Sequence, residues 1–401
     1  MKLRFAVHYF LLFAMMGTVF PYVQLFLRAR GFSDAEVGYL QGLLALASVA
    51  GPLAAGHLAD RLGRRRLALA AGLAVAAAVL PPLDSAGSFA AAAALLVALG
   101  LFGRTAIPLT DTLASAELPD PTHTYGKVRV WGSAGFIAVL AAVALFGLID
   151  ETSGTSIMYA MLVTTCACLG SSLLLPDSHR RAAHPAARPR GAGNRTPAAF
   201  DAVFWLFLAV AASQALGMSA YYFFFTNYLR DVVGLNPAGW VWAIGPAAEM
   251  PMLFCAGRLI RRFGLRAMLG ASLASVSVRL VVYALAPSLW AILPVQLLHA
   301  ASFGLFHAAS IEFLRRKVPA ERRGLAMAAY MSLGLGLPNW LASSAGGLIV
   351  ERAGYAALYL LYAAFPAAGL ALVAAAGARL NVAAPAVGQA ARAVPAGATS
   401  A

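Results

Sequence analysis

Five side chains that can ionise lie inside long apolar stretches of the sequence. They are Asp111, Arg129, Glu249, Arg279 and His299. A charge near the centre of a bilayer costs about 2.5–3.5 kcal/mol, so such residues are usually kept for a function. An arginine beside a carboxylate can bind the hydroxyl or carboxylate groups of a ligand, and a buried carboxyl or imidazole group can carry a proton. The pattern predicts binding of a small solute together with a proton inside a membrane.

The spacing of these residues sorts them into two pairs. Asp111 and Arg129 each lie nine positions from the centre of the turn between them, a depth of about 13 Å at 1.5 Å per helical residue. Arg279 and His299 each lie ten positions from the centre of a second turn, about 15 Å deep from the opposite surface. Both pairs are therefore expected near the bilayer midplane. A purely structural ion pair is the alternative interpretation of Asp111 and Arg129.

The composition indicates that these residues belong to a membrane protein. Of 401 residues, 61% are hydrophobic and 11% are charged, against about 25% charged in a typical soluble domain. The apolar runs are too long for a closed barrel, so we expect an all-α bundle. The predicted spans are 5–28, 36–59, 66–84, 88–114, 124–149, 155–176, 201–229, 236–260, 266–287, 289–314, 322–350 and 354–377.

The distribution of basic residues predicts the topology. The net charge is +14, and the arginines cluster in short loops between apolar runs. Such clusters are typical of cytoplasmic loops and not of a nucleic-acid-binding surface, so both termini are expected on the cytoplasmic side of the membrane. The expected membrane is the inner membrane of a bacterium. The expected units are an N-terminal six-helix half, a cytoplasmic linker, a C-terminal six-helix half and a disordered cytoplasmic tail: 1–176, 177–200, 201–377 and 378–401.

A basic motif occurs once in each half. GHLADRLGRRR starts at Gly56, and GRLIRRFGLR starts at Gly257, 201 residues later. Each copy joins the second and third predicted spans of its half, as expected for two parallel repeats. The first copy resembles the loop motif of the major facilitator superfamily. That resemblance implies a latch that holds one conformation of a transporter, formed by Gly56, Asp60, Arg61, Gly63 and Arg64.

Other segments resemble the phenylpropionate-permease branch of this superfamily, a relative of the lactose and nucleoside symporters. They are AAEMPMLF (247–254) and LLHAASFGLFHAAS (297–310), whereas YGKVRVWGSAGF (125–136) resembles the lactose-transporting members of the superfamily. The resemblance implies two pseudo-symmetric halves that rock around a central site, and uptake of a small aromatic acid with a proton. The expected substrate-binding residues are Asp111, Arg129, Arg279, Phe136 and Tyr22, and those for proton coupling are Glu249, His299 and Asp111.

Two positions depart from the sugar-transporting members of the superfamily. Ser302 stands where the resemblance implies a proton-coupling carboxylate, and Phe136 stands where it implies a tryptophan that stacks on sugar. Both departures disfavour lactose, but uptake of another sugar or of a nucleoside remains open. So do proton-driven export of drug-like compounds and ligand sensing without transport. Arg104, seven residues before Asp111 on the same helical face, is an alternative partner for that carboxylate or a further ligand-binding arginine.

The sequence carries no signature of catalysis. Its three cysteines lie in apolar segments and do not have the spacing of metal ligands. The sequence also contains no nucleotide-binding loop motif. We therefore expect no enzymatic activity, cofactor or metal. The expected partners are a small-molecule substrate, a proton and the lipid bilayer, with the protein as a monomer.

Overall fold

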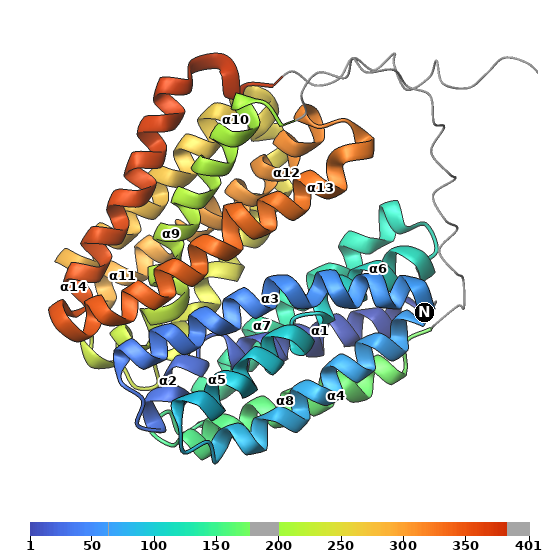
Figure 1. Cartoon of the computed structure of the whole chain (residues 1–401), viewed down its shortest axis with the longest axis vertical. Helices are drawn as coiled ribbons and strands as arrows, with labels where there is room; N and C mark the ends of the chain where they lie inside the picture. Colours follow the sequence, from blue (N-terminus) through green and yellow to red (C-terminus); the bar gives the residue numbers. More distant parts are fainter. Residues whose placement is uncertain (63, 177–199, 383–401) are drawn as a thin grey trace, which may run out of the picture.

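The computed structural model describes residues 1–62, 64–176 and 200–382, and within these ranges the chain is helical and contains no strand. Figure 1 shows two groups of helices, one ending with α8 and the other beginning with α9. Nine helical stretches of the described residues are long and apolar enough to cross a membrane. The expected all-α membrane protein is confirmed in this part of the chain.

The helices follow the predicted spans in order. The N-terminal half contains α1 (Lys2–Val19), α2 (Val23–Ala29), α3 (Asp34–Leu62), α4 (Arg65–Asp84), α5 (Phe89–Ala98), η1 (Leu99–Gly103), α6 (Ala106–Glu117), α7 (Pro121–Phe146) and α8 (Gly154–Leu173). The C-terminal half contains α9 (Ala202–Asp231), η2 (Gly239–Ala243), α10 (Ile244–Leu285), α11 (Leu289–Gln296), η3 (Ala300–Leu305), α12 (Phe306–Lys317), η4 (Ala320–Arg322), α13 (Arg323–Ala329), η5 (Tyr330–Gly336), α14 (Leu337–Ala376) and η6 (Gly377–Leu380).

Two of these helices each cover more than one predicted span. α10 and α14 contain one glycine apiece with a non-helical backbone, Gly264 (φ 82°) and Gly354 (φ 79°). Glycine adopts a positive φ without the clash that a Cβ would cause, so the chain can kink sharply at these positions. The spans on either side of each glycine are separate helical segments joined by a very tight turn.

The internal repeat extends beyond the basic motif. A π-helix interrupts the fourth predicted span at η1 and the tenth at η3, and the two begin 201 residues apart, like the basic motifs. The helices before them, α5 and α11, start in the same way, because the side chains of Ser88 and Ser288 accept hydrogen bonds from the first-turn N–H groups. π-Helical segments are frequent at functional sites, and both precede helices that carry ionisable residues.

The two halves meet mainly along α3 and α14. Gly38 of α3 lies against Gly347 of α14, and a Cβ added to Gly38 would come within 2.9 Å of the Gly347 Cα. Small residues allow this approach, as in other membrane helix pairs. In Figure 1 the halves touch at one end and diverge towards the end where α1 begins. The touching end, called the closed end below, contains residues 28–34, 150–152, 231–239 and 351–355.

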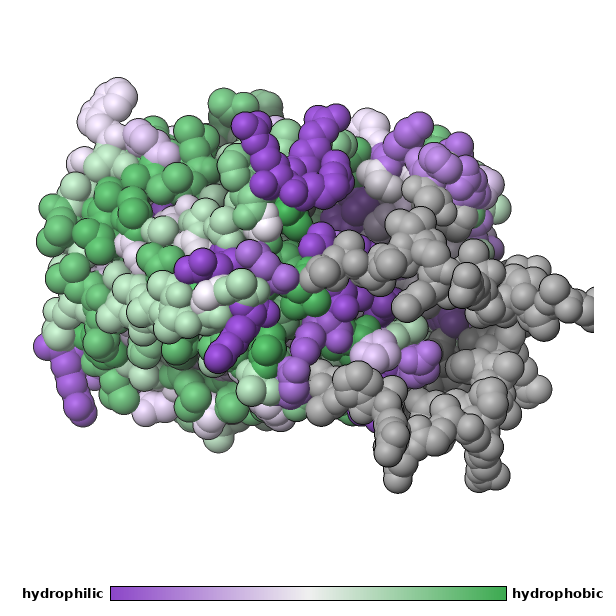
Figure 2. Space-filling model, turned by 90° about the horizontal axis from the view of Figure 1, so that it is seen from above, coloured by the Kyte–Doolittle hydropathy of each residue, from purple (hydrophilic) through white to green (hydrophobic). Residues whose placement is uncertain are grey.

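The outer surface matches a lipid environment. Large apolar side chains such as Trp290 and Phe254 are 87% and 77% exposed, which is unfavourable for a protein surrounded by water. Figure 2 shows that hydrophilic side chains gather towards the right of the view, and that apolar side chains cover most of the left. The surface therefore divides into a lipid-compatible region and a polar end.

The C-terminal half begins with a capped and ion-paired residue. Asp201 accepts hydrogen bonds from the N–H groups of Val203 and Phe204, and its carboxylate lies 2.6 Å from the Lys317 ammonium. Desolvation opposes ionisation of this carboxyl, but the contact with Lys317 and the two N–H groups prevail and lower its pKa. The start of α9 is thereby tied to the end of α12.

Candidate functional site

Asp111 on α6 and Arg129 on α7 form the pair that their spacing predicted. The Arg129 Nε lies 3.9 Å from the Asp111 Oδ1, and the two side chains are 31% and 33% exposed. The Tyr9 hydroxyl on α1 donates a hydrogen bond of 2.6 Å to the same carboxylate oxygen. Side chains from three helices therefore form one polar cluster, and this cluster is partly exposed, so a ligand could contact it.

Aromatic side chains of α1 position the arginine. The Arg129 Cζ lies 4.2 Å from the centroid of the Phe13 ring and 5.4 Å from that of Tyr9. Gly132 permits the close packing, because a Cβ there would come within 2.8 Å of the Phe13 ring. Tyr125 packs edge-on against Tyr9 at 6.4 Å. The aromatic contacts therefore hold the guanidinium against the Phe13 ring.

Ionisable residues of the C-terminal half lie across from this group. α7 packs on α10, and the charge of Arg129 is close enough to interact electrostatically with Glu249 of α10 and His307 of α12. Glu249 is half-buried against Gly304 of η3. The charge of Arg129 thus acts on two ionisable residues of the C-terminal half.

Arg279 lies in a different environment, with only 1% of its surface exposed. Its guanidinium donates to neutral side chains only: Tyr283 (3.2 Å), Gln296 (2.8 Å), Ser302 (2.8 Å), Met218 (3.7 Å) and His299 (3.3 Å). Its Cζ also lies 4.5 Å from the centroid of the Tyr221 ring. No ion pair among the described residues includes Arg279. The predicted pairing with His299 is confirmed, but it is formed in the core of the C-terminal half.

His299 itself is buried and lies at one end of a row of rings. Its ring stacks on Phe303 at 5.7 Å, and Phe303 stacks on His307 at 6.0 Å. Phe303 and His307 are exposed, whereas His299 is 6% exposed. The row runs from the buried Arg279 cluster to the surface that faces Arg129.

The predicted aromatic residues Phe136 and Tyr22 are buried in this conformation. Phe136 is 8% exposed and packs against Gly17 of α1. Tyr22 is fully buried between α1 and α2, where it packs on Gly239 of η2 in the other half. Neither side chain presents surface to a ligand here, because α1 packs closely on α7 at the first position and the halves meet at the second.

The predicted latch lies at the border of the described residues. Gly56 lies in α3 and is half-buried, and Arg64 is exposed just before α4. Asp60 and Arg61 also fall in α3, but their side chains lie outside the described part of the structure, and so does Gly63. The latch therefore remains a prediction.

The sequence did not predict that Tyr9 and Phe13 contribute to the site, nor that Arg104 stacks on an aromatic ring. Tyr9 and Phe13 flank Arg129, and Phe20 stacks on Arg104, whose Cζ lies 3.9 Å from the ring centroid. Tyr9 and Phe13 lie in α1 and Phe20 directly follows it; their intervals of four and seven residues are the spacing of a single helical face. That periodicity was the available signal. The alternative pairing of Arg104 with Asp111 is not among the ion pairs of the described residues.

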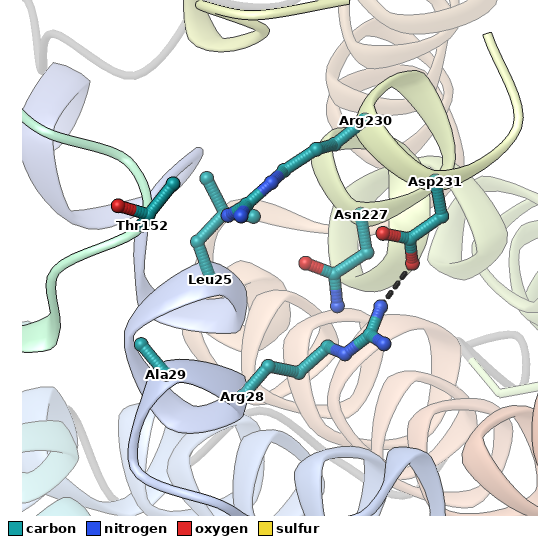
Figure 3. A pocket seen from close by; sticks show the side chains of 7 residues that line it. All are labelled: Leu25, Arg28, Ala29, Thr152, Asn227, Arg230 and Asp231. Atoms are coloured by element: carbon teal, nitrogen blue, oxygen red, sulfur yellow. Dashed lines mark hydrogen bonds and ion pairs between the residues drawn. The ribbon is translucent and has the colours of Figure 1, made fainter. Parts of the chain in front are cut away.

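The closed end contains a second group of charged residues and a pocket of 190 Å³. Figure 3 shows its lining side chains, which come from α2, the loop before α8, and α9: Leu25, Arg28, Ala29, Thr152, Asn227, Arg230 and Asp231. Arg28 is ion-paired with Asp231 across the two halves, and Tyr355 donates to the same carboxylate at 3.0 Å. Because these opposite charges pair with each other, the residues that line the pocket form a contact between the two halves.

Glu151 strengthens the same contact. This carboxylate is 2% exposed and accepts hydrogen bonds from the N–H groups of Ala238 (2.8 Å) and Gly239 (3.0 Å) at the start of η2. Arg230 of α9 donates to the Glu151 carbonyl oxygen at 2.7 Å. A loop of the N-terminal half therefore caps a helix of the C-terminal half, a role that the sequence did not reveal.

Comparisons with known proteins agree on one family. The model of the MFS_1 like family matches residues 2–361. A maltose permease of Geobacillus stearothermophilus is 28% identical over 368 residues, which cover 90% of this chain and 91% of the permease. A probable 3-phenylpropionic acid transporter of Escherichia coli (strain K12) is 25% identical over 365 residues, covering 89% of this chain and 93% of that protein.

Solved structures share the fold. The crystal structure of the nucleoside transporter NupG superposes with a TM-score of 0.77 at 17% identity, covering 93% of this chain and 98% of that one. An inward open structure of the xylose transporter XylE from Escherichia coli gives a TM-score of 0.68 at 15% identity, covering 96% of each chain. At these identities the structures establish the architecture alone.

Proposed function

Because the chain belongs to the MFS_1 like family and hence to the membrane transporters of the major facilitator superfamily, we propose that it takes up a small organic acid, preferably an aromatic one, together with a proton. One observation carries this proposal. The half-exposed Arg129, stacked on Phe13 and paired with Asp111, interacts electrostatically with Glu249 of the other half. Substrate sites of such transporters lie between the two repeats near the midplane.

The polar group is suited to an anion with an apolar body. Arg129 offers planar N–H donors that match a carboxylate, and charge-assisted bonds of this kind are stronger than neutral ones. The ring of Phe13 is half-buried beside it, and aromatic pairs add stabilisation beyond the apolar area they bury. A carboxylate with an attached ring therefore satisfies both features.

Glu249 is the proposed proton carrier. An anion bound to Arg129 would offset the positive charge that Arg129 presents to this carboxyl. Anion binding therefore makes protonation of Glu249 easier, and by linkage a protonated Glu249 strengthens anion binding. This reciprocity couples the two species without direct contact between them. His299 is buried in the C-terminal half and cannot contact the ligand in this conformation. We therefore propose that it acts indirectly, through its contacts with Arg279 and Phe303.

Transport would follow from movement of one half against the other. The closed end joins the halves through Arg28, Glu151 and Gly38, and the opposite end diverges (Figure 1). On the proposed topology, in which both termini lie in the cytoplasm of a bacterium, this conformation would face inward. The Asp60 latch would act on the cytoplasmic side when that side closes.

Sugar uptake is the second candidate. The maltose permease relative favours it, and so does the acceptor capacity of Asp111, since carboxylates commonly bind ligand hydroxyl groups. Only one oxygen of that carboxylate is hydrogen-bonded to Tyr9. A neutral polyol would use Asp111 and Arg129 together without needing an anion site.

Uptake into proteoliposomes separates these proposals. We would supply labelled 3-phenylpropionate, maltose or uridine, with and without an inward proton gradient. The expected result is accumulation of 3-phenylpropionate that depends on the gradient. Gradient-driven accumulation of maltose or uridine alone would move the substrate class to sugars or nucleosides. Gradient-driven export would indicate an antiporter, and binding without flux would indicate a sensor.

A further inference from the structure

Two glutamates at the closed end accept hydrogen bonds from backbone N–H groups of the half to which they do not belong. Glu151, in the loop before α8, accepts from Ala238 (2.8 Å) and Gly239 (3.0 Å) at the start of η2. Glu351 of α14 accepts from Ala35 (2.9 Å) in the first turn of α3. N–H groups in a first turn have no partner within their own helix, so each half supplies an acceptor that the other half lacks.

The two contacts occupy corresponding places in the internal repeat. Glu151 and Glu351 are 200 residues apart, close to the 201-residue interval of the basic motifs. Each lies between the fifth and sixth predicted spans of its half, and each binds the start of the second predicted span of the other half. The halves are therefore joined by a reciprocal pair of contacts.

Both carboxylates are suited to stabilise a closed junction. A carboxylate that accepts from N–H groups at the start of a helix forms charge-assisted bonds and lies at the positive end of the helix dipole. Glu151 is 2% exposed, whereas Glu351 is exposed, so water competes less for the first contact. Because the two members of each contact belong to different halves, both contacts must break when the closed end opens.

We propose that Glu151 and Glu351 are positioning residues of the transport cycle, which form a clasp that sets how often the closed end opens. The clasp consists of these two side chains and the three N–H groups that they bind. A contact that exists in only one of two conformations shifts the equilibrium towards that conformation. The clasp requires a transporter but no particular substrate or coupling ion, so it goes beyond the function proposed above.

Glu36 provides a matched control for Glu351. The Ser33 N–H donates to the Glu36 carboxylate at 2.9 Å, and the Glu36 N–H donates to the Ser33 hydroxyl at 3.3 Å, which is the capping box of a helix start. Both glutamates therefore cap α3, but Glu36 belongs to α3 itself and Glu351 to the other half. Loss of the Glu36 cap affects the open and closed conformations alike, whereas loss of the Glu351 cap affects the closed one.

Thiol labelling at position 227 measures how often the closed end opens. Asn227 is 1% exposed and lines the pocket between the halves (Figure 3). Its side-chain amide has no hydrogen-bond partner in the described part of the chain, so Asn227→Cys removes no side-chain bond. The three native cysteines are replaced by alanine, and a water-soluble maleimide is added to the purified protein in detergent. When labelling is slow relative to reclosing, its rate follows the population of the open conformation.

The expected effects are ordered by the contacts that each variant removes. Glu351→Ala should raise the labelling rate about 2- to 30-fold, the range expected for a lost cap, and Glu36→Ala should change it less than about twofold. Glu151→Gln keeps the shape of the side chain but replaces one acceptor oxygen by an NH₂ group, so it should also raise the rate. The double variant Glu151→Gln/Glu351→Ala should show about the product of the single effects, because the two contacts share no residue.

Melting temperatures identify any variant that has lost its fold. The exposed Glu351 keeps the test decisive if the change at the buried Glu151 prevents folding. Unchanged labelling in folded Glu351→Ala, or an equal rise in Glu351→Ala and Glu36→Ala, would overturn the clasp. No substrate is added in these measurements, so failure of proton-driven uptake would refute the proposed function and leave the clasp standing.

Discussion

Arg129 and Arg279 are both arginines inside membrane spans, yet the two halves use them differently. Arg129 is 31% exposed at the surface between the halves and pairs with a carboxylate. Arg279 is 1% exposed and is surrounded by neutral side chains of its own half. In the proposed function the first exchanges its partner for a ligand, whereas the second holds several helices together. An intramembrane charge is thus a reason to look for function, and its exposure decides which function.

The energetic consequences follow from the same difference. A partly exposed ion pair contributes about 0–1 kcal/mol to stability, because solvent screens it. A buried neutral acceptor that loses its hydrogen-bond donor costs about 1–3 kcal/mol, and removal of a large buried side chain adds the cost of a cavity. Removal of the two arginines should therefore affect different measurements.

Arg279→Ala should have the largest effect, which is loss of folded protein. It leaves the side-chain oxygens of Gln296 and Ser302 without their donor and opens a cavity beside Tyr221. We expect a destabilisation of about 2–5 kcal/mol from the unsatisfied acceptors and the cavity, measured as folded yield and melting temperature after solubilisation. A stable Arg279→Ala protein that lacks only uptake would transfer Arg279 to the ligand site and end the contrast.

Arg129→Ala should abolish uptake and leave folding nearly intact. The change removes the proposed anion-binding donors, but the half-exposed pair contributes only about 0–1 kcal/mol to stability. We expect binding of 3-phenylpropionate to weaken about tenfold or more, with a melting temperature within a few degrees of the wild type. Parallel loss of protein and uptake would instead show that the pair with Asp111 is structural.

Glu249→Gln should separate substrate movement from proton coupling. Glutamine has nearly the shape of glutamic acid but cannot release a proton, so it mimics the protonated carrier. Gradient-driven accumulation should be lost, whereas exchange of labelled for unlabelled substrate across the membrane should persist. Accumulation at the wild-type level would exclude Glu249 as the proton carrier and direct attention to Asp111.

Asp111→Asn should have the smallest effect and sharpen the substrate class. The change removes the negative charge beside Arg129 while the amide oxygen can still accept from Tyr9. Acid binding should strengthen a few-fold, since Arg129 becomes available to the ligand, and binding of neutral sugars should weaken. Competition between 3-phenylpropionate and maltose measures both at once, and the reverse pattern would favour sugar uptake.

Spacing alone located the two ionisable pairs correctly. Asp111 and Arg129 interact, and so do Arg279 and His299, because the rise of a helix and the centre of a turn fix the depth of each residue. The same reasoning missed Tyr9, Phe13 and the stacking of Arg104 on Phe20. Aromatic side chains are common throughout this apolar chain, so their period on α1 did not distinguish a ligand site from ordinary packing.

The spacing of residues in the sequence did not predict how exposed each side chain would be. Tyr22 and Phe136 were expected to line the site and are buried here, whereas Glu151 was unremarked and joins the two halves. Contacts between α2, η2 and the loop before α8 decide these cases, and they connect residues far apart in the sequence.

The sequence by itself determined the all-helical architecture, the order of the spans and the repeat at an interval of 201 residues. Those properties depend on length, composition and helical rise, which are local. Only the tertiary structure decided which face of each helix meets another helix, so only it set Arg129 at the surface between the halves and Arg279 in a core. The physical reason is that lipid and protein interior are both apolar, so hydrophobic periodicity does not mark the inward face of a membrane helix.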